Sequence, residues 1–151
     1  MKTPTQHEQD LSGMHLWLLL WKASRAVEAH SARSIARFDM GISDFGVLEA
    51  LMHKGPLTVK QLGEKVLLTS GSMTVAVDRL IKRGLVTRCD DKKDRRARII
   101  NLTDKGRETI SMAFAQHRLA MERAVGNFTQ QERAEILPLL RRLGRTADEN
   151  L

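Results

Sequence analysis

Residues 84–106 read GLVTRCDDKKDRRARIINLTDKG. Two runs that favour strands flank a charged loop, so we expect a β-hairpin that ends at Leu102, where a new helix begins. The stretch from Arg79 to Arg98 holds nine Lys or Arg and three Asp, a net charge of +6, whereas the whole chain of 151 residues carries +7. Charge concentrated in this way predicts a surface that binds the phosphates of a nucleic acid.

Two short helices are predicted before this hairpin. Thr58 and Gln61 form a capping-box pattern that begins the first helix. The second runs over residues 70–83 and ends at Gly84, because glycine readily takes the left-handed conformation that terminates a helix. Two short helices followed by a basic hairpin are typical of the winged helix-turn-helix fold, in which the second helix enters the DNA major groove.

Longer helices are predicted on both sides of this unit. Residues 11–39 lack proline and, after Gly13, glycine, which favours one long helix. Ser43 can cap a further helix that ends at residue 55. After the hairpin, Thr103 can cap a helix that extends to about residue 125, and a second capping box begins a last helix over about residues 129–147. The expected fold is therefore mainly α with a small β-hairpin wing.

An apolar run of six residues, from Leu16 to Trp21, lies in the first of these helices. It is too continuous for a helix that is apolar on one side only. We therefore expect burial on more than one side, most simply against a second copy of the chain. The run is far shorter than the roughly 20 residues that cross a bilayer, so we expect no membrane span.

The single cysteine, Cys89, cannot form an intrachain disulfide, and the first ten residues contain four charged or imidazole side chains rather than the apolar centre of a signal peptide. A cytoplasmic location is therefore expected.

Several motifs agree with one another along the chain. ISDFGVL occupies residues 42–48, GLV residues 84–86, and DRR at residues 94–96 is followed by LTDKG at residues 102–106. Together they resemble the MarR family of bacterial transcription regulators over nearly the whole chain. The resemblance implies a homodimer whose first and last helices intertwine and whose wing arginine enters a minor groove. By this match Arg96 is the wing arginine, and Asp94 is the acid that orients the wing.

The resemblance also implies the domain organisation. We expect a single domain over residues 1–151, with the winged helix-turn-helix at residues 43–102 and dimerisation helices at residues 11–39 and 103–147.

The predicted DNA contacts fall into two groups. Small and hydroxyl-bearing residues at the start of the helix over residues 70–83 allow close approach to base edges. The expected base readers are Ser70, Ser72, Thr74, Asp78 and Arg79. Arginine suits a narrow minor groove because its planar cation is weakly hydrated. The expected wing contacts are Lys92, Lys93, Arg95, Arg96 and Arg98. Asp94 would repel phosphate, so its expected role is an ion pair with Arg79 or Arg88.

A ligand site is expected near the first helix. Trp17 and Trp21 lie one helical turn apart, and Arg25, a further turn along, can bind a carboxylate. The family resemblance implies an aromatic acid or a phenol between this helix and the DNA-binding unit. For at least one of these tryptophans, packing in the core or in a dimer is the preferred interpretation.

Cys89 has two interpretations. Nearby cations favour an oxidation-sensitive thiol, whereas Asp90 and Asp91 oppose it, so a small packing residue on a strand is the preferred interpretation. The five histidines show no i, i+3 or i, i+4 pairs, and neither phosphate-loop nor nucleophile-elbow patterns occur. We therefore expect no metal, no cofactor and no enzyme activity.

The function expected from the sequence is that of a sequence-specific DNA-binding regulator. It would be a homodimeric repressor that leaves a palindromic operator when a small aromatic or phenolic ligand binds. Its expected partners are double-stranded DNA, a second copy of the chain and that ligand. Two alternatives remain: a redox-responsive regulator that acts through Cys89, and a sequence-blind architectural DNA-binding protein.

Overall fold

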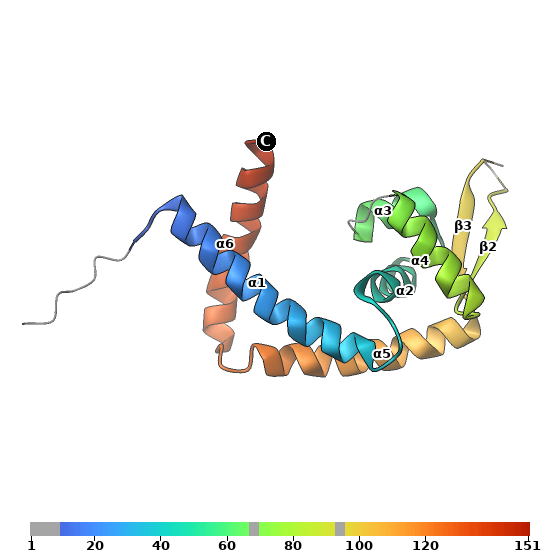
Figure 1. The fold of residues 1–151 in the computed structure, drawn as a ribbon, viewed down its shortest axis with the longest axis horizontal. Coiled ribbons are helices and arrows are strands. Elements are labelled where there is room, and N and C mark those ends of the chain that lie inside the picture. The colour runs from blue at the N-terminus through green and yellow to red at the C-terminus, as the bar shows by residue number, and fades with distance from the viewer. Residues whose placement is uncertain (1–9, 67–69, 93–95) are drawn as a thin grey trace, which may run out of the picture.

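The computed structural model describes residues 10–66, 70–92 and 96–151 (Figure 1). In chain order the elements are α1 (Gly13–Ala36), α2 (Ile42–Lys54), β1 (Leu57–Thr58), α3 (Val59–Val66), α4 (Ser70–Lys82), β2 (Val86–Asp90), β3 (Arg98–Leu102), α5 (Asp104–Ala124) and α6 (Gln130–Glu149). The mainly helical fold with a small hairpin is confirmed. Figure 1 shows α2, α3, α4 and the hairpin gathered at one end of α5, with α1 and α6 beside its other end.

The hairpin belongs to a three-stranded antiparallel sheet with the order β1-β3-β2. Leu57 in β1 pairs with Ile100 in β3, and Val86 in β2 pairs with Leu102. Ile100 and Leu102 both face the core, as their spacing of two predicts. Strand β1 was not predicted, because two residues are too few to give an alternating pattern.

Local capping patterns were mostly read correctly. The backbone N–H of Thr58 donates to Gln61 Oε1 at 2.9 Å, and the backbone N–H of Gln61 donates to Thr58 Oγ1 at 3.2 Å, which confirms that capping box. The expected cap at Ser43 is wrong. Helix α2 begins at Ile42, and its cap is Gly41, which already has an extended backbone as the chain leaves the preceding turn.

A second capping box, at the start of α6, is also confirmed. The hydroxyl and backbone N–H of Thr129 donate to the Glu132 carboxylate. These hydrogen bonds lower the pKa of the Glu132 carboxyl group below its ordinary value, since they favour the ionised form.

The LTDKG motif attaches α5 to the hairpin. Thr103 Oγ1 donates to the carbonyl oxygen of Gly84 at 2.7 Å and accepts from the backbone N–H of Gly106 at 2.9 Å. The backbone N–H of Thr103 also donates to the carbonyl oxygen of Leu85. A Cβ at Gly106 would overlap that same carbonyl group, so only glycine allows the first turn of α5 to lie this close to Leu85.

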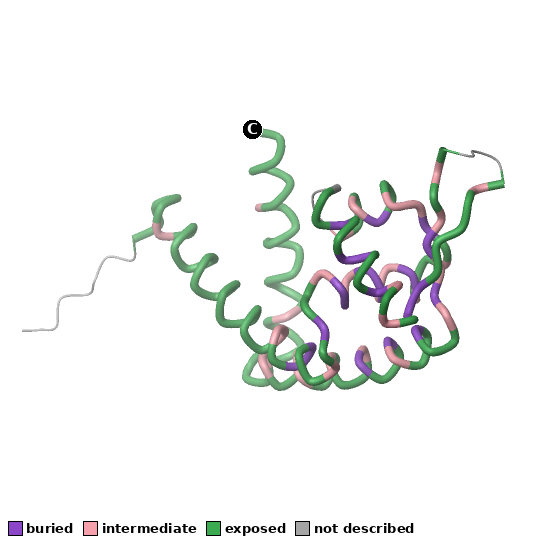
Figure 2. The backbone as a smooth tube through the Cα atoms, turned by 45° about the vertical axis from the view of Figure 1, so that its right-hand side comes forward, coloured by how far each residue is buried: buried purple, intermediate pink, exposed green. Residues whose placement is uncertain are grey.

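The core lies within the winged-helix unit and the first half of α5. Figure 2 shows that buried backbone is concentrated there, whereas α1 and α6 are almost entirely exposed. Helix α6 has no buried residue, and only Ser34 and Ile35 are buried in α1. Among the described residues, the largest fully buried side chains are Leu48, Leu51, Leu62, Met73, Leu80, Leu85, Ile100, Ile110, Val47, Val77 and Val86.

Candidate nucleic-acid interface

Helix α4 has one buried face and one exposed face. Its buried residues recur at helical spacing and pack in the core: Met73, Ala76, Val77 and Leu80. The remaining face carries most of the predicted base readers: Ser72, Thr74, Asp78 and Arg79 are all exposed. Ser70 is the first residue of the helix. The pattern of the sequence therefore oriented this helix correctly.

An ion pair joins α4 to the hairpin. Arg88 Nη2 on β2 lies 2.6 Å from Asp78 Oδ1, and both side chains remain partly accessible to solvent. The guanidinium holds the Asp78 carboxylate in place and offsets its charge. The exposed face of α4 and the basic hairpin consequently form one continuous surface.

A second ion pair joins α4 to α2. Arg79 Nε lies 3.0 and 2.9 Å from the two carboxylate oxygens of Asp44, and Arg79 Nη2 lies 2.5 Å from Oδ1. The side chain of Asp44 is 3% exposed, whereas that of Arg79 is 46% exposed. The hydrogen bonds that it donates to Asp44 raise the pKa of the Arg79 guanidinium above its ordinary value.

These contacts change the expected partners of the two arginines. We expected Asp94 to pair with Arg79 or Arg88, but the structure pairs Arg79 with Asp44 and Arg88 with Asp78. Asp94 itself lies outside the described residues. Asp44 is a residue that the sequence analysis missed, because nothing local to it indicates a partner 35 positions away.

The wing is present as predicted. Arg98 on β3 forms an ion pair with Asp90, directly opposite it on β2. Lys92 and Arg96 are exposed beyond the ends of the two strands. The other predicted wing residues, Lys93 and Arg95, lie outside the described residues.

Cys89 is exposed on β2, so the preferred interpretation of a packing residue is wrong. It pairs with Ile99, whose neighbour Ile100 faces the core. Because side chains alternate along strands, Cys89 lies on the outer face of the sheet. Its sulfur lies 3.8 Å from the carbonyl oxygen of Ile99.

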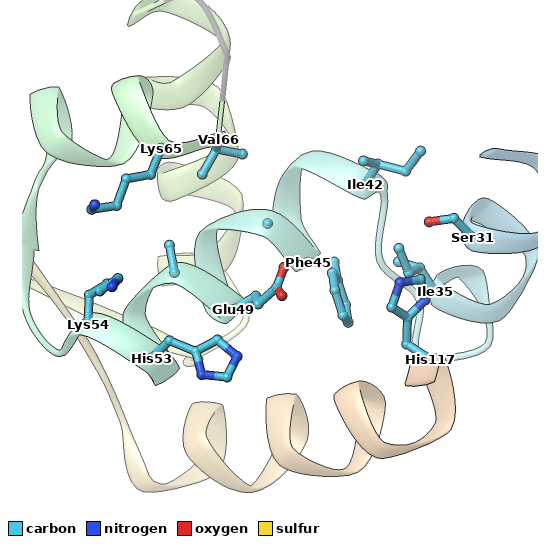
Figure 3. A pocket seen from close by; sticks show the side chains of 12 residues that line it. Ser31, Ile35, Ile42, Phe45, Glu49, His53, Lys54, Lys65, Val66 and His117 are labelled. Carbon is cyan, nitrogen blue, oxygen red and sulfur yellow. The ribbon is translucent and has the colours of Figure 1, made fainter. Parts of the chain in front are cut away.

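A cavity of about 520 Å³ lies between α1, α2, α3 and α5 (Figure 3). Its lining residues are Ser31, Ile35, Ile42, Phe45, Gly46, Glu49, Ala50, His53, Lys54, Lys65, Val66 and His117. Trp17, Trp21 and Arg25, the predicted ligand residues, are not among them. The two indole rings stack with their centroids 6.4 Å apart, and the Arg25 guanidinium lies 6.0 Å from the centre of the Trp21 ring, on an exposed part of α1.

His117 lines this cavity from α5. Ser34 Oγ donates to the carbonyl oxygen of Ser31 at 2.8 Å and lies 2.8 Å from His117 Nδ1. Since the single hydroxyl proton is directed at Ser31, His117 Nδ1 is the donor to Ser34. In the neutral imidazole Nε2 is then an acceptor. The ring also packs against Phe45, with 4.8 Å between centroids. His117 was not predicted as a site residue, because in the sequence no second histidine lies near it at helical spacing.

A wide groove of about 1090 Å³ separates α1 from α6. Its lining is mostly aliphatic: Leu16, Leu19, Leu20, Ala23, Ser24, Val27, Val125, Phe128, Arg133, Ile136, Leu137, Leu139, Leu140, Arg142, Leu143 and Thr146. The apolar run of α1 thus lies on a surface that this single chain leaves uncovered.

In the parts of the chain that the structure describes, no three His, Cys, Asp or Glu side chains gather so that they could hold a metal ion. Within the same residues, no helix combines the length and the apolar composition needed to cross a membrane.

Comparison with known proteins agrees with the fold described above. The model of the MarR family matches residues 38–97. The HTH-type transcriptional regulators YkoM and MhqR of Bacillus subtilis are 31% and 30% identical to this chain. The YkoM match covers 95% of this chain and 94% of YkoM, and the MhqR match covers 90% and 94%. The crystal structure of Sco3205, a MarR family regulator of Streptomyces coelicolor in complex with DNA, superposes with a TM-score of 0.81 at 26% identity, over 88% of this chain and 86% of Sco3205.

Proposed function

The chain belongs to the MarR family of DNA-binding transcriptional regulators, and from this premise we propose that it is a homodimeric repressor that a small aromatic ligand releases from a palindromic operator. The family and the relatives are regulators of transcription rather than enzymes. One observation carries the proposal: the exposed polar face of α4 is joined to a basic hairpin by the Arg88–Asp78 ion pair. A reading helix and a phosphate-binding wing are thereby held in one orientation.

In the proposed complex α4 enters the major groove and the hairpin follows the adjacent backbone and minor groove. Ser72, Thr74 and Asp78 present hydroxyl and carboxylate groups to base edges. Arg79 is committed to Asp44, so we assign it the role of positioning α4. Arg96 and Lys92 are the described wing residues that supply charge beyond the strand ends.

The proposed dimer forms through α1 and α6. These helices bury almost nothing within one chain, yet they carry most of its exposed large apolar side chains. A second copy is the simplest cover for such a surface, because a two-fold interface is self-complementary. The two α4 helices of a dimer would lie roughly 34 Å apart, which suits an inverted repeat.

The proposed ligand site is the cavity in Figure 3. It lies between α1 and α5, which belong to the dimerisation region, and α2 and α3, which belong to the winged-helix unit. A ligand there can change the distance between the two α4 helices. It releases DNA only to the extent that it prefers the non-binding conformation. His117 Nε2 and the Phe45 ring suit a hydroxylated aromatic ring.

The proposal is tested by fluorescence anisotropy with the duplex upstream of the protein's own gene and a scrambled duplex of equal length. We expect tight binding to the native duplex, a clear gap over the scrambled one, and a steep loss of affinity between about 50 and 200 mM salt. Equal binding to both duplexes at every salt concentration would favour an architectural protein instead.

Arg96→Ala is expected to weaken operator binding by about 1–3 kcal/mol, because it removes a wing cation from a narrow groove. The same anisotropy titration measures the effect. Arg118→Ala, which removes an exposed arginine on α5, is the matched control and should bind as the wild type does. If the two variants bind the operator with equal affinity, the wing does not contribute to binding.

His117→Phe is expected to reduce the response to a phenolic probe such as catechol while leaving operator affinity unchanged. The substitution keeps an aromatic ring beside Phe45 but removes the acceptor nitrogen. The measurement is the catechol concentration that releases half of the bound operator, and we expect it to rise at least about tenfold. Cys89→Ser is the control, because Cys89 is exposed on the hairpin. Loss of the response in Cys89→Ser, with His117→Phe unaffected, would establish the redox alternative.

A further inference from the structure

Val75 is an apolar side chain on the exposed face of α4. It is 59% exposed, and among the described residues between 43 and 111 it is the only large hydrophobic side chain that is exposed. The other exposed large hydrophobic residues belong to α1, α6 and the segments beside them, to Ile42 and to α5. Val75 therefore stands alone among polar neighbours on the helix that the proposed function places on DNA.

The immediate surroundings of Val75 are open. Gly71 lies one turn before it, and a Cβ added there would meet no atom within 4 Å. Asp78 lies almost one turn after it, where Arg88 holds the carboxylate from the hairpin side. Residues separated by three or four positions share a helix face. Gly71, Val75 and Asp78 therefore lie in one row along α4. In that row the two methyl groups of Val75 lie between the open space at Gly71 and the carboxylate of Asp78, which Arg88 holds in place.

The chemistry of the major groove limits what such a side chain can recognise. Every base pair presents hydrogen-bond donors and acceptors there, but only thymine presents an apolar group, its 5-methyl. A valine side chain cannot form a hydrogen bond. A base donor or acceptor that is buried against it therefore loses its partner, which costs free energy. Contact with a thymine methyl instead removes apolar surface of both partners from water.

We propose that Val75 is a specificity-determining residue that reads the 5-methyl group of a thymine in each operator half-site. This inference rests on the proposed placement of α4 in the major groove. Asp78 follows Val75 by about 4.5 Å along the helix axis, so the two side chains would contact different positions of the half-site. The buried face of α4, which includes Ala76 and Val77, fixes the rotation of the helix and leaves Val75 directed outward.

The test uses an operator that the full-length protein selects from a pool of random duplexes. Each thymine of the half-site is replaced in turn, in both halves, by deoxyuridine, which removes only the 5-methyl group. For the wild type we expect one position at which the replacement weakens binding about fourfold per half-site, the effect of one buried methyl group. The Val75→Ala variant should bind the thymine and deoxyuridine duplexes equally. Because Val75 is exposed, this variant should fold normally.

Met112→Ala is the matched control, since Met112 is an apolar side chain of similar exposure on α5. It should retain the full deoxyuridine effect. The inference is overturned if the wild type is indifferent to every replacement, or if Val75→Ala retains the effect. Either result leaves sequence-specific binding, and hence the proposed function, intact. A pool that yields no preferred sequence would instead overturn both.

Discussion

Arg79→Ala is expected to lower the free energy of unfolding by about 3 kcal/mol, a loss typical of a buried carboxylate whose partner is removed. Asp44 is nearly inaccessible to solvent, and both of its oxygens accept hydrogen bonds from the Arg79 guanidinium. Alanine would leave that negative charge without compensation in the interior, between α2 and α4. The measurement is urea unfolding followed by circular dichroism at one fixed protein concentration.

The control variants separate the effect of losing the ion pair from the effect of losing side-chain volume. Lys82→Ala removes an exposed cation from the same helix and should change stability by less than about 0.5 kcal/mol. Arg79→Lys keeps the charge but not the paired hydrogen-bond geometry, so we expect an intermediate loss. The double variant Asp44→Ala, Arg79→Ala should be more stable than Arg79→Ala alone, because no charge then remains buried. If Arg79→Ala matches Lys82→Ala, the pair does not stabilise the fold.

This ion pair shows how far sequence patterns reach. Arg79 lies on the polar side of its helix, which is why it was predicted to read bases. Its actual partner is 35 positions earlier, in a helix where Asp44 follows the expected cap and resembles any acid of a first turn. The Ser34–His117 hydrogen bond spans 83 positions and was equally inaccessible. Contacts of this kind depend on how helices pack, which local periodicity does not specify.

Predictions that depend on three or four consecutive residues succeeded more often. The caps at Thr58, Thr103 and Thr129, and the left-handed Gly84, are all present because each is decided by hydrogen bonds or backbone angles within one turn. Gly106 of the LTDKG motif was recognised by resemblance alone. Only the structure supplies its physical reason, which is the close approach of Gly106 to the backbone of Leu85.

The apolar run in α1 illustrates a limit of composition. Residues 16–21 were expected to be buried on more than one side, and Trp17 and Trp21 to line a ligand site. In the single chain the run is exposed, as it would be before a second copy covers it, and the cavity lies farther along α1, at Ser31 and Ile35. Apolar faces that form cores, ligand sites and dimer interfaces have the same residue types, so their positions had to come from the fold.

The second large effect is expected for a substitution in the exposed groove between α1 and α6. Leu137→Glu should convert the proposed dimer into a monomer and lower operator affinity at least about a hundredfold, because the two half-sites would no longer be bound together. Leu137 is 50% exposed in the single chain and lines the groove. A carboxylate there costs little in a monomer, whereas in an apolar interface it would be buried without a partner.

Sedimentation equilibrium measures the mass, and anisotropy with the operator measures the affinity. Leu11→Glu is the control: Leu11 is 85% exposed and does not line the groove, so this variant should remain a dimer. Circular dichroism distinguishes a folded monomer from an unfolded chain. Neither result is expected if the dimer interface lies elsewhere, because Leu137 would then remain exposed to solvent. A Leu137→Glu protein with the mass and affinity of the wild type would place the dimer contact away from α6. The basic wing would then have to be brought to DNA by a different arrangement of the two chains.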